Sequence, residues 1–233
     1  MGPGCDTTVG SCQSGGMDVG ILGGTGPAGQ ALAARLAAVG YDVVVGSRSE
    51  DKASAACDEL RARWPGYRLS LEPSTNEGAA KSTLVVVGTQ WAAAEPTVAS
   101  VADALGGKVV ISMGNALTKV GKELLAVHLP AGSVAAAVQA AAPDAMVAAA
   151  FQHVPARELG QLDHPMVGDV LICTDHAEAL EATSALVRAI PDLRPLSAGS
   201  LAMAGTVEAF TAVLVRFRKA SLRLTGIDTV AQA

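Results

Sequence analysis

The chain has few aromatic side chains, no paired cysteine motif and no excess of basic charge. Phe, Trp and Tyr make up 3% of its 233 residues, so alanine, valine and leucine must fill the core, as suits closely packed α/β layers. A net charge of −5 argues against a nucleic-acid partner. The four cysteines include no Cys-x-x-Cys pair and accompany no histidine cluster. They indicate reduced thiols in a cytoplasmic protein without a metal site.

Long apolar runs and a targeting segment are also missing. Residues 124–143 contain no Asp, Glu, Lys or Arg, but Pro130, Gly132 and Gln139 interrupt them and most of their apolar residues are alanine. We therefore expect no membrane-spanning helix and no membrane partner. Residues 1–16 lack the basic start and apolar centre of a signal peptide, and their Gly, Ser and Thr content predicts a disordered tail.

One glycine-rich stretch organises the rest of the chain. An apolar run at residues 19–22 leads into Gly-Gly-Thr-Gly-Pro-Ala-Gly at 23–29. Alanines and leucines at helical spacing follow, and a second apolar run occupies 41–45. A strand, a glycine turn, a helix and a second strand in this order are the layout of a dinucleotide-binding unit. The alternative is a tight strand-to-helix turn in some other α/β protein.

The residues of this turn have separate expected roles. Gly24 would permit the tight turn, Gly26 would let the backbone approach a pyrophosphate, and Gly29 would let the helix pack closely on the strand. The pyrophosphate would sit on the N–H groups at the start of the helix. The cofactor-binding candidates in the turn are Gly24, Thr25, Gly26, Pro27 and Ala28.

The end of the second strand indicates which dinucleotide binds. NAD sites usually carry Asp or Glu there, whereas this chain has Ser47 and Arg48, with Lys52 one helical turn further on. A hydroxyl, a guanidinium and an ammonium group suit a 2′-phosphate, so the sequence favours NADP. The alternative is an exposed basic pair at a helix start.

The remaining pattern predicts an α/β fold in two parts. Apolar runs predict buried parallel strands at 83–88, 108–112, 146–151 and 168–174. We also expect a short strand at 67–71 and a loop at 193–199. Helical patterns cover 50–64, 92–104, 133–141, 176–190 and 200–222. We expect an NADP-binding Rossmann domain at 17–150 and a smaller C-terminal domain at 151–233. The loops after two of the strands offer ligand-binding candidates by position: Thr89, Gln90, Trp91, Gly114 and Asn115.

Over residues 17–228 the sequence resembles the F420-dependent NADP oxidoreductases. The matching stretches include GILGGTGPAGQALAARLAAVGYDVVVGSRSEDKA, VVISMGNAL, AAFQHVPARELGQLDHP, DVLICTDH, LRPLSAGSL and VEAFTAVL. The resemblance implies a Rossmann-type doubly wound parallel sheet with a smaller C-terminal α/β domain packed on it. It also implies a homodimer, and NADP(H) and coenzyme F420 as the two redox cofactors.

The resemblance also implies roles for individual residues. The 2′-phosphate of NADP would be held by Thr25, Ser47, Arg48 and Lys52, and Trp91 and Ala156 would lie near the nicotinamide. The deazaflavin cleft would include Asn115, Ala116, Gln152, His153, Val154 and Leu224. The chain departs from the family at one place: Gln152-His153-Val154-Pro155-Ala156 stands where archaeal members have His-Thr-Ile-Pro-Ala. In an extended segment, the displaced His153 would face away from the family's histidine position.

The implied reaction is hydride transfer between C5 of the deazaflavin and C4 of the nicotinamide, with no obligatory catalytic acid or base. A basic cluster, Arg216, Arg218, Lys219 and Arg223, could meet the anionic tail of F420 or form a solvated helix face.

Two other functions stay open at this point. One is an NADPH- or F420-dependent reductase of another small molecule, such as an imine, and the other is a non-catalytic NADPH-binding sensor.

Overall fold

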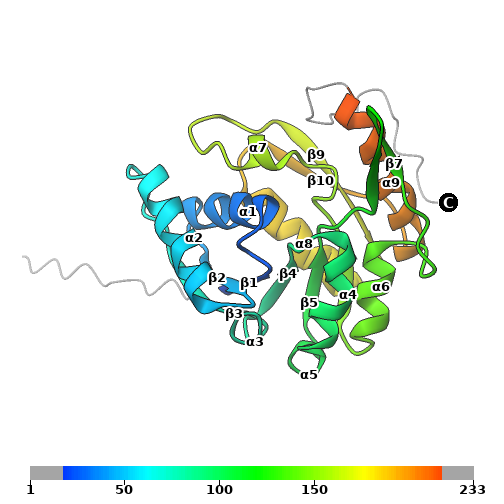
Figure 1. Ribbon diagram of the computed structural model, residues 1–233, viewed down its shortest axis with the longest axis horizontal. Coiled ribbons are helices and arrows are strands. Elements are labelled where there is room, and N and C mark those ends of the chain that lie inside the picture. Colours follow the sequence, from blue (N-terminus) through cyan, green and yellow to red (C-terminus); the bar gives the residue numbers. More distant parts are fainter. Residues whose placement is uncertain (1–17, 217–233) are drawn as a thin grey trace, which may run out of the picture.

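The computed structural model of the protein describes residues 18–216 and is built around one eight-stranded sheet (Figure 1). In spatial order the strands are β10 (Leu193–Ser197), β9 (Gly168–Thr174), β8 (Met146–Ala149), β5 (Val109–Ser112), β4 (Leu84–Val87), β1 (Asp18–Leu22), β2 (Asp42–Ser47) and β3 (Leu71–Thr75). Every neighbouring pair is parallel except β8 with β9. The tail at 1–16, together with Leu224, Arg218, Lys219 and Arg223, lies outside the described residues.

Helices cover both faces of the sheet, and each face has its own apolar core. One layer contains α1 (Pro27–Ala38), α2 (Glu50–Arg63), α7 (Ala156–Leu159) and α8 (Ala177–Ala189). The other contains α3 (Asn76–Ala79), α4 (Trp91–Ala99), α5 (Ala102–Leu105), α6 (Val134–Ala141), the 3₁₀ turn η1 (Leu201–Met203) and α9 (Ala204–Arg216). Successive strand residues alternate between the two cores, as Val86 and Val87 do. This mostly parallel, two-faced sheet confirms the predicted Rossmann-type fold class.

Several predicted elements are wrong in position or kind. The third strand begins at Leu71 rather than ending there, and residues 193–199, predicted to be a loop, contain β10. Both strands carry a proline, Pro73 or Pro195, which lacks an N–H group for a sheet. Both are edge strands, where an unused N–H position costs little. The helix predicted at 92–104 is divided into α4 and α5.

A two-stranded antiparallel hairpin that the sequence analysis did not predict stands apart from the main sheet. It consists of β6 (Leu117–Val120) and β7 (Glu123–Ala126). It lies beside α9 (Figure 1), and the guanidinium of Arg216 at the end of α9 pairs with the Glu123 carboxylate at 2.6 Å. The hairpin and α9 thus form one wall at the edge of the sheet.

The expected boundary near residue 150 falls next to β8. That strand pairs with β5 on one side and with β9 on the other, so the strands of the C-terminal part extend the same sheet. The division into two domains stays a prediction. Among residues 18–216, no helix is long and apolar enough to cross a membrane.

Candidate functional site

A cleft of about 1560 Å³ opens at the carboxyl ends of the six parallel strands that neighbour one another from β3 to β8. The segments that follow these strands form its floor, and the β6–β7 hairpin and α9 contribute Leu117, Leu124, Thr211, Leu214 and Val215. The edge where the parallel strands end is where open α/β sheets bind ligands.

Most residues that the sequence singled out line this one cleft. They are Thr25, Gly26, Pro27, Ala28, Ser47, Arg48, Lys52, Thr89, Gln90, Trp91, Gly114, Asn115, Gln152, His153, Val154 and Ala156. Gly24 and Ala116 are not among the residues that line the cleft, and both are buried. The structure therefore brings the nucleotide-binding turn and the 152–156 segment to a common space, although about 125 residues separate them in the chain.

The glycines of the turn differ in how much space the surrounding protein atoms leave for a side chain. A Cβ at Gly29 would lie 2.7 Å from the Gly24 Cα, and a Cβ at Gly24 would lie 3.0 Å from a Val45 methyl group. A Cβ at Gly26 would meet no protein atom closer than 3.6 Å, an ordinary contact distance. Protein packing therefore requires Gly24 and Gly29. Gly26 instead leaves open space at the N-terminus of α1, where a pyrophosphate would approach the backbone.

Asn76 supports the turn from a distant part of the chain, and the sequence analysis missed it. Its Oδ1 accepts a hydrogen bond from the backbone N–H of Gly23 at 3.1 Å, and the side chain is buried. Gly23 has a φ of +67°, a conformation that favours glycine. The two residues are 53 positions apart, so only the fold pairs them.

One end of the cleft carries basic side chains at the start of α2. Arg48 and Lys52 are exposed, and neither forms an ion pair with another residue in 18–216. Glu77 is the only Asp or Glu among the described residues that line the cleft. Ser47 contributes a hydroxyl that accepts a hydrogen bond from the Ser49 N–H at 3.4 Å. Two free cations beside a hydroxyl fit a phosphate group at this end.

At the opposite end, the segment after β8 makes a turn instead of extending. Phe151 is buried and has a φ of +63°, which is unusual for a bulky residue. The backbone carbonyl of Gln152 then accepts hydrogen bonds from Asn115 Nδ2 at 2.5 Å and Thr211 Oγ1 at 3.4 Å. Gln152 and His153 both line the cleft. The prediction that an extended segment would turn His153 away does not apply.

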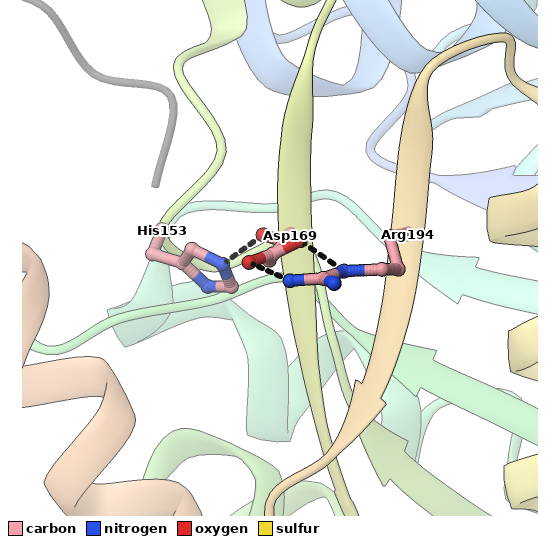
Figure 2. A network of polar contacts seen from close by, with 3 residues as sticks. All are labelled: His153, Asp169 and Arg194. Atoms are coloured by element: carbon pink, nitrogen blue, oxygen red, sulfur yellow. Dashed lines mark hydrogen bonds and ion pairs between the residues drawn. The ribbon is translucent and has the colours of Figure 1, made fainter. Parts of the chain in front are cut away.

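The His153 ring is fixed by a neighbouring strand pair (Figure 2). Its Nε2 lies 2.9 Å from the backbone carbonyl of Asp169 on β9. A carbonyl only accepts hydrogen bonds, so Nε2 carries the proton and Nδ1 of the neutral ring is an acceptor. Burial lowers the pKa of His153 and favours this neutral form. The buried Asp169 carboxylate is held in turn by Arg194 on β10 through two hydrogen bonds of 2.8 and 2.9 Å.

Several buried polar atoms at the cleft have no hydrogen-bond partner within residues 18–216. They are Thr89 Oγ1, His153 Nδ1 and both side-chain amide atoms of Gln152. Gln152 and His153 are each 4% exposed. Buried polar groups in proteins are nearly always paired, so these atoms are available to a polar ligand in the cleft. No group of described residues could hold a metal ion.

The α9 wall is anchored by a buried carboxylate. Glu208, 4% exposed, accepts hydrogen bonds from the N–H groups of Val134 and Ala135 at the start of α6, at 3.0 and 3.2 Å. Burial raises the pKa of Glu208 to about 7, against the opposing effect of these two N–H groups.

This raised pKa predicts a pH-dependent stability. Above its ordinary pKa of 4.5, the carboxyl ionises in the unfolded chain, but in the folded protein it ionises only near pH 7. The wild-type free energy of unfolding should therefore fall between pH 4.5 and 7 relative to that of Glu208→Gln, whose amide does not ionise. Denaturant unfolding of both proteins at pH 5 and pH 7.5 measures the difference. An equal change in the two proteins would contradict the assignment.

A family model and two proteins similar to this chain carry equivalent descriptions. A family model described as "NADP oxidoreductase coenzyme F420-dependent" matches residues 18–116. The chain is 33% identical over 222 residues to the F420-dependent NADP reductase of Methanothermobacter thermautotrophicus, covering 91% of this chain and 96% of that protein. It is 30% identical to the protein of the same name from Methanocaldococcus jannaschii, covering 91% of this chain and 100% of that protein.

A solved structure has a fold similar to that of this chain. It is described as a putative F420-dependent NADP reductase from Arthrobacter sp. FB24, and it superimposes with a TM-score of 0.75. The identity is 20%, and the match covers 90% of this chain and 99% of that one.

Proposed function

Because the chain belongs to the family of F420-dependent NADP reductases, we propose that it transfers a hydride between NADP(H) and coenzyme F420 in the cleft described above. The observation that carries the proposal is the composition of this cleft. At one end the cleft has the glycine turn and the side chains of Arg48 and Lys52, which form no ion pair within residues 18–216. At the other end it has the 152–156 segment, with the unpartnered polar atoms of Gln152 and His153.

At the first end, this chain's residues bind NADP. The N–H groups at the start of α1 receive the pyrophosphate, and Gly26 keeps the approach open. Arg48 and Lys52, with Ser47, bind the 2′-phosphate, and Thr25, Pro27 and Ala28 line the same turn. Trp91, Asn115 and Ala156 also line the cleft and would border the nicotinamide.

At the second end, the residues hold the deazaflavin. Gln152 offers an amide N–H and a carbonyl, and His153 offers a ring acceptor, to the polar edge of a flat heterocycle. Val154, Leu214 and Leu117 supply an apolar surface that excludes water. The bound cofactors themselves supply the redox chemistry. The chain positions the two rings and needs no catalytic acid or base to move the hydride.

The assay that tests this function uses purified protein, NADPH and oxidised F420, with absorbance followed for both cofactors. We expect NADPH and F420 to be consumed in a one-to-one ratio. A parallel reaction with FMN in place of F420 should be much slower. Turnover that is independent of F420, or equal with FMN, would contradict the proposal and favour a reductase of another small molecule.

The glycine turn provides a matched pair of variants. Gly26→Ala should weaken NADP binding at least about 10-fold, because the new methyl group fills the space of the pyrophosphate, and should leave thermal stability nearly unchanged. Gly29→Ala should instead lower the melting temperature, because its Cβ meets the Gly24 backbone at 2.7 Å. Calorimetric titration with NADP and thermal melts separate the two effects. Equal NADP affinity in wild type and Gly26→Ala would contradict the placement.

We also propose a homodimer in the cytoplasm, with no nucleic-acid or membrane partner. Phe210 and Val213 lie one turn apart on α9 and are 39% and 47% exposed, which leaves apolar side chains on one helix face for a second subunit. The free thiols of Cys57 and Cys173 are buried and support a reducing compartment. Sedimentation equilibrium tests the dimer, and a monomer at micromolar concentration would contradict it.

A further inference from the structure

A buried arginine outside the cleft connects the two helices that border it. Arg35, in the last turn of α1, is 6% exposed. Its guanidinium donates hydrogen bonds to four backbone carbonyls at the C-terminal end of α7 and just beyond. The acceptors are Leu159 at 2.8 Å, Gln161 at 2.7 Å, Glu158 at 3.2 Å and His164 at 3.5 Å.

The charge of Arg35 is stabilised by carbonyl groups rather than by a carboxylate. Within residues 18–216, no Asp or Glu forms an ion pair with it. The last carbonyls of a helix have no intrahelical donors and carry the negative end of the helix dipole. Arg35 satisfies these carbonyls at the end of α7 and so binds α7 to α1.

Both helices begin at the cleft. Pro27 and Ala28 at the start of α1 line the cleft, and so does Ala156 at the start of α7. Further along, α7 and α1 approach closely: a Cβ at Gly160 would lie 3.3 Å from the Cβ of Ala31. Arg35 lies one helical turn beyond Ala31 on α1, so its hydrogen bonds are formed next to this apolar contact.

Apolar packing contributes to the contact between the two helices, because Leu159 is fully buried in the same core as Ala31 and Leu32. A second cavity of about 350 Å³ lies beside it, lined by Pro27, Ala31, Ala34, Leu60, Ala156 and Gly160 among others. The small side chains of Ala31, Ala34 and Ala156 therefore face open space on one side. The four hydrogen bonds of Arg35 add directional contacts to the apolar packing.

We propose that Arg35 is a positioning residue: by holding α7 on α1, it sets the distance between the nucleotide-binding turn and the 152–156 segment. It touches neither cofactor. This inference rests on the proposed function, because the distance matters through the two rings that these segments hold. A displacement of about 1 Å between reacting groups can slow a reaction by about 100-fold.

The test compares Arg35→Met, which keeps most of the side-chain length but has no donors, with Arg35→Lys, which keeps a charge and up to three donors. Arg188→Met is the matched control, since Arg188 is exposed in the last turn of α8 and does not line the cleft. The hydride-transfer rate is measured in a single turnover with NADPH already bound, per NADPH-binding site, and the dissociation constant of NADP is measured separately.

We expect Arg35→Met to slow hydride transfer per site by about 10- to 100-fold while the NADP dissociation constant changes less than about 3-fold. Arg35→Lys should recover part of the rate, and Arg188→Met should match the wild type. A merely structural role would lower the number of binding sites and leave the rate per site unchanged. That outcome, or a parallel loss of NADP affinity, would overturn the inference.

Hydrogen exchange provides a second measurement that does not depend on activity. In Arg35→Met with NADP bound, the backbone amides of Gly160 and Gln161, which close the end of α7, should exchange faster than in wild type. Unchanged exchange would overturn the inference. If the wild type failed to reduce F420, the proposed function would fail, while the exchange result would still decide whether Arg35 holds α7.

Discussion

Replacing Arg48 with alanine should lower kcat/KM for NADPH by roughly 10- to 150-fold and leave the value for NADH nearly unchanged. The guanidinium is exposed at the start of α2 and is free of ion pairs among the described residues, so it is available to the extra phosphate that only NADP carries. A hydrogen bond to a charged partner contributes about 1.5–3 kcal/mol, which corresponds to that range. Steady-state kinetics with both nucleotides and saturating F420 measure the preference.

Arg68 provides the matched control for this experiment. It is also exposed, but it lies outside the cleft, and Arg68→Ala should retain the wild-type preference for NADPH. Lys52→Ala should show a smaller loss in the same direction, because an ammonium group lacks the bidentate geometry of a guanidinium. Equal weakening of NADPH and NADH in Arg48→Ala would mean that Arg48 acts structurally.

Replacing Gln152 with methionine should raise stability and lower activity at the same time. The Gln152 amide is buried and has no partner within residues 18–216, so its removal should raise the free energy of unfolding by about 1–3 kcal/mol. Methionine has a similar shape but offers the deazaflavin no hydrogen bond. We expect kcat/KM for F420 to fall about 10- to 100-fold, with NADP affinity unchanged. Denaturant unfolding and steady-state kinetics measure the two effects.

Thr183 on α8 shows what a buried polar atom does away from the cleft. Its hydroxyl is also buried and unpartnered, but the residue does not line the cleft. Thr183→Val should therefore raise stability while kcat/KM for F420 stays at the wild-type value. If Gln152→Met behaved like Thr183→Val, with a gain in stability and full activity, Gln152 would not bind the substrate.

The sequence predicted the elements whose pattern is local. The apolar runs that became β1, β2, β4, β5 and β9 lie within one or two residues of their predicted bounds, because a strand buried on both faces is apolar throughout. The edge strands β3 and β10 were placed wrongly or missed. Pro73, Pro195 and neighbouring polar residues are usual in loops, and only a neighbouring strand makes these segments part of a sheet.

The nucleotide end of the site was more predictable than the deazaflavin end. Gly26, Arg48 and Lys52 belong to one unit of about thirty residues, so spacing alone brings them together. The Asn76 contact with Gly23 and the Asp169 contact with His153 depend on strand order and on a turn at Phe151 that no local pattern indicates. For the Asn76 contact, the sequence offers only an asparagine close to a predicted loop, and this pattern is too common to indicate a specific contact.

The measurement that tests the central claim most directly follows a deuterium label from C4 of NADPH. If the two cofactors meet in one water-excluding cleft between the glycine turn and the 152–156 segment, the deuterium that leaves NADPH should appear at C5 of reduced F420. None should appear in the solvent. Mass spectrometry of the two products, with the faces of the nicotinamide labelled separately, gives this result. Deuterium recovered in water, or NADPH oxidised without label in F420, would contradict the account.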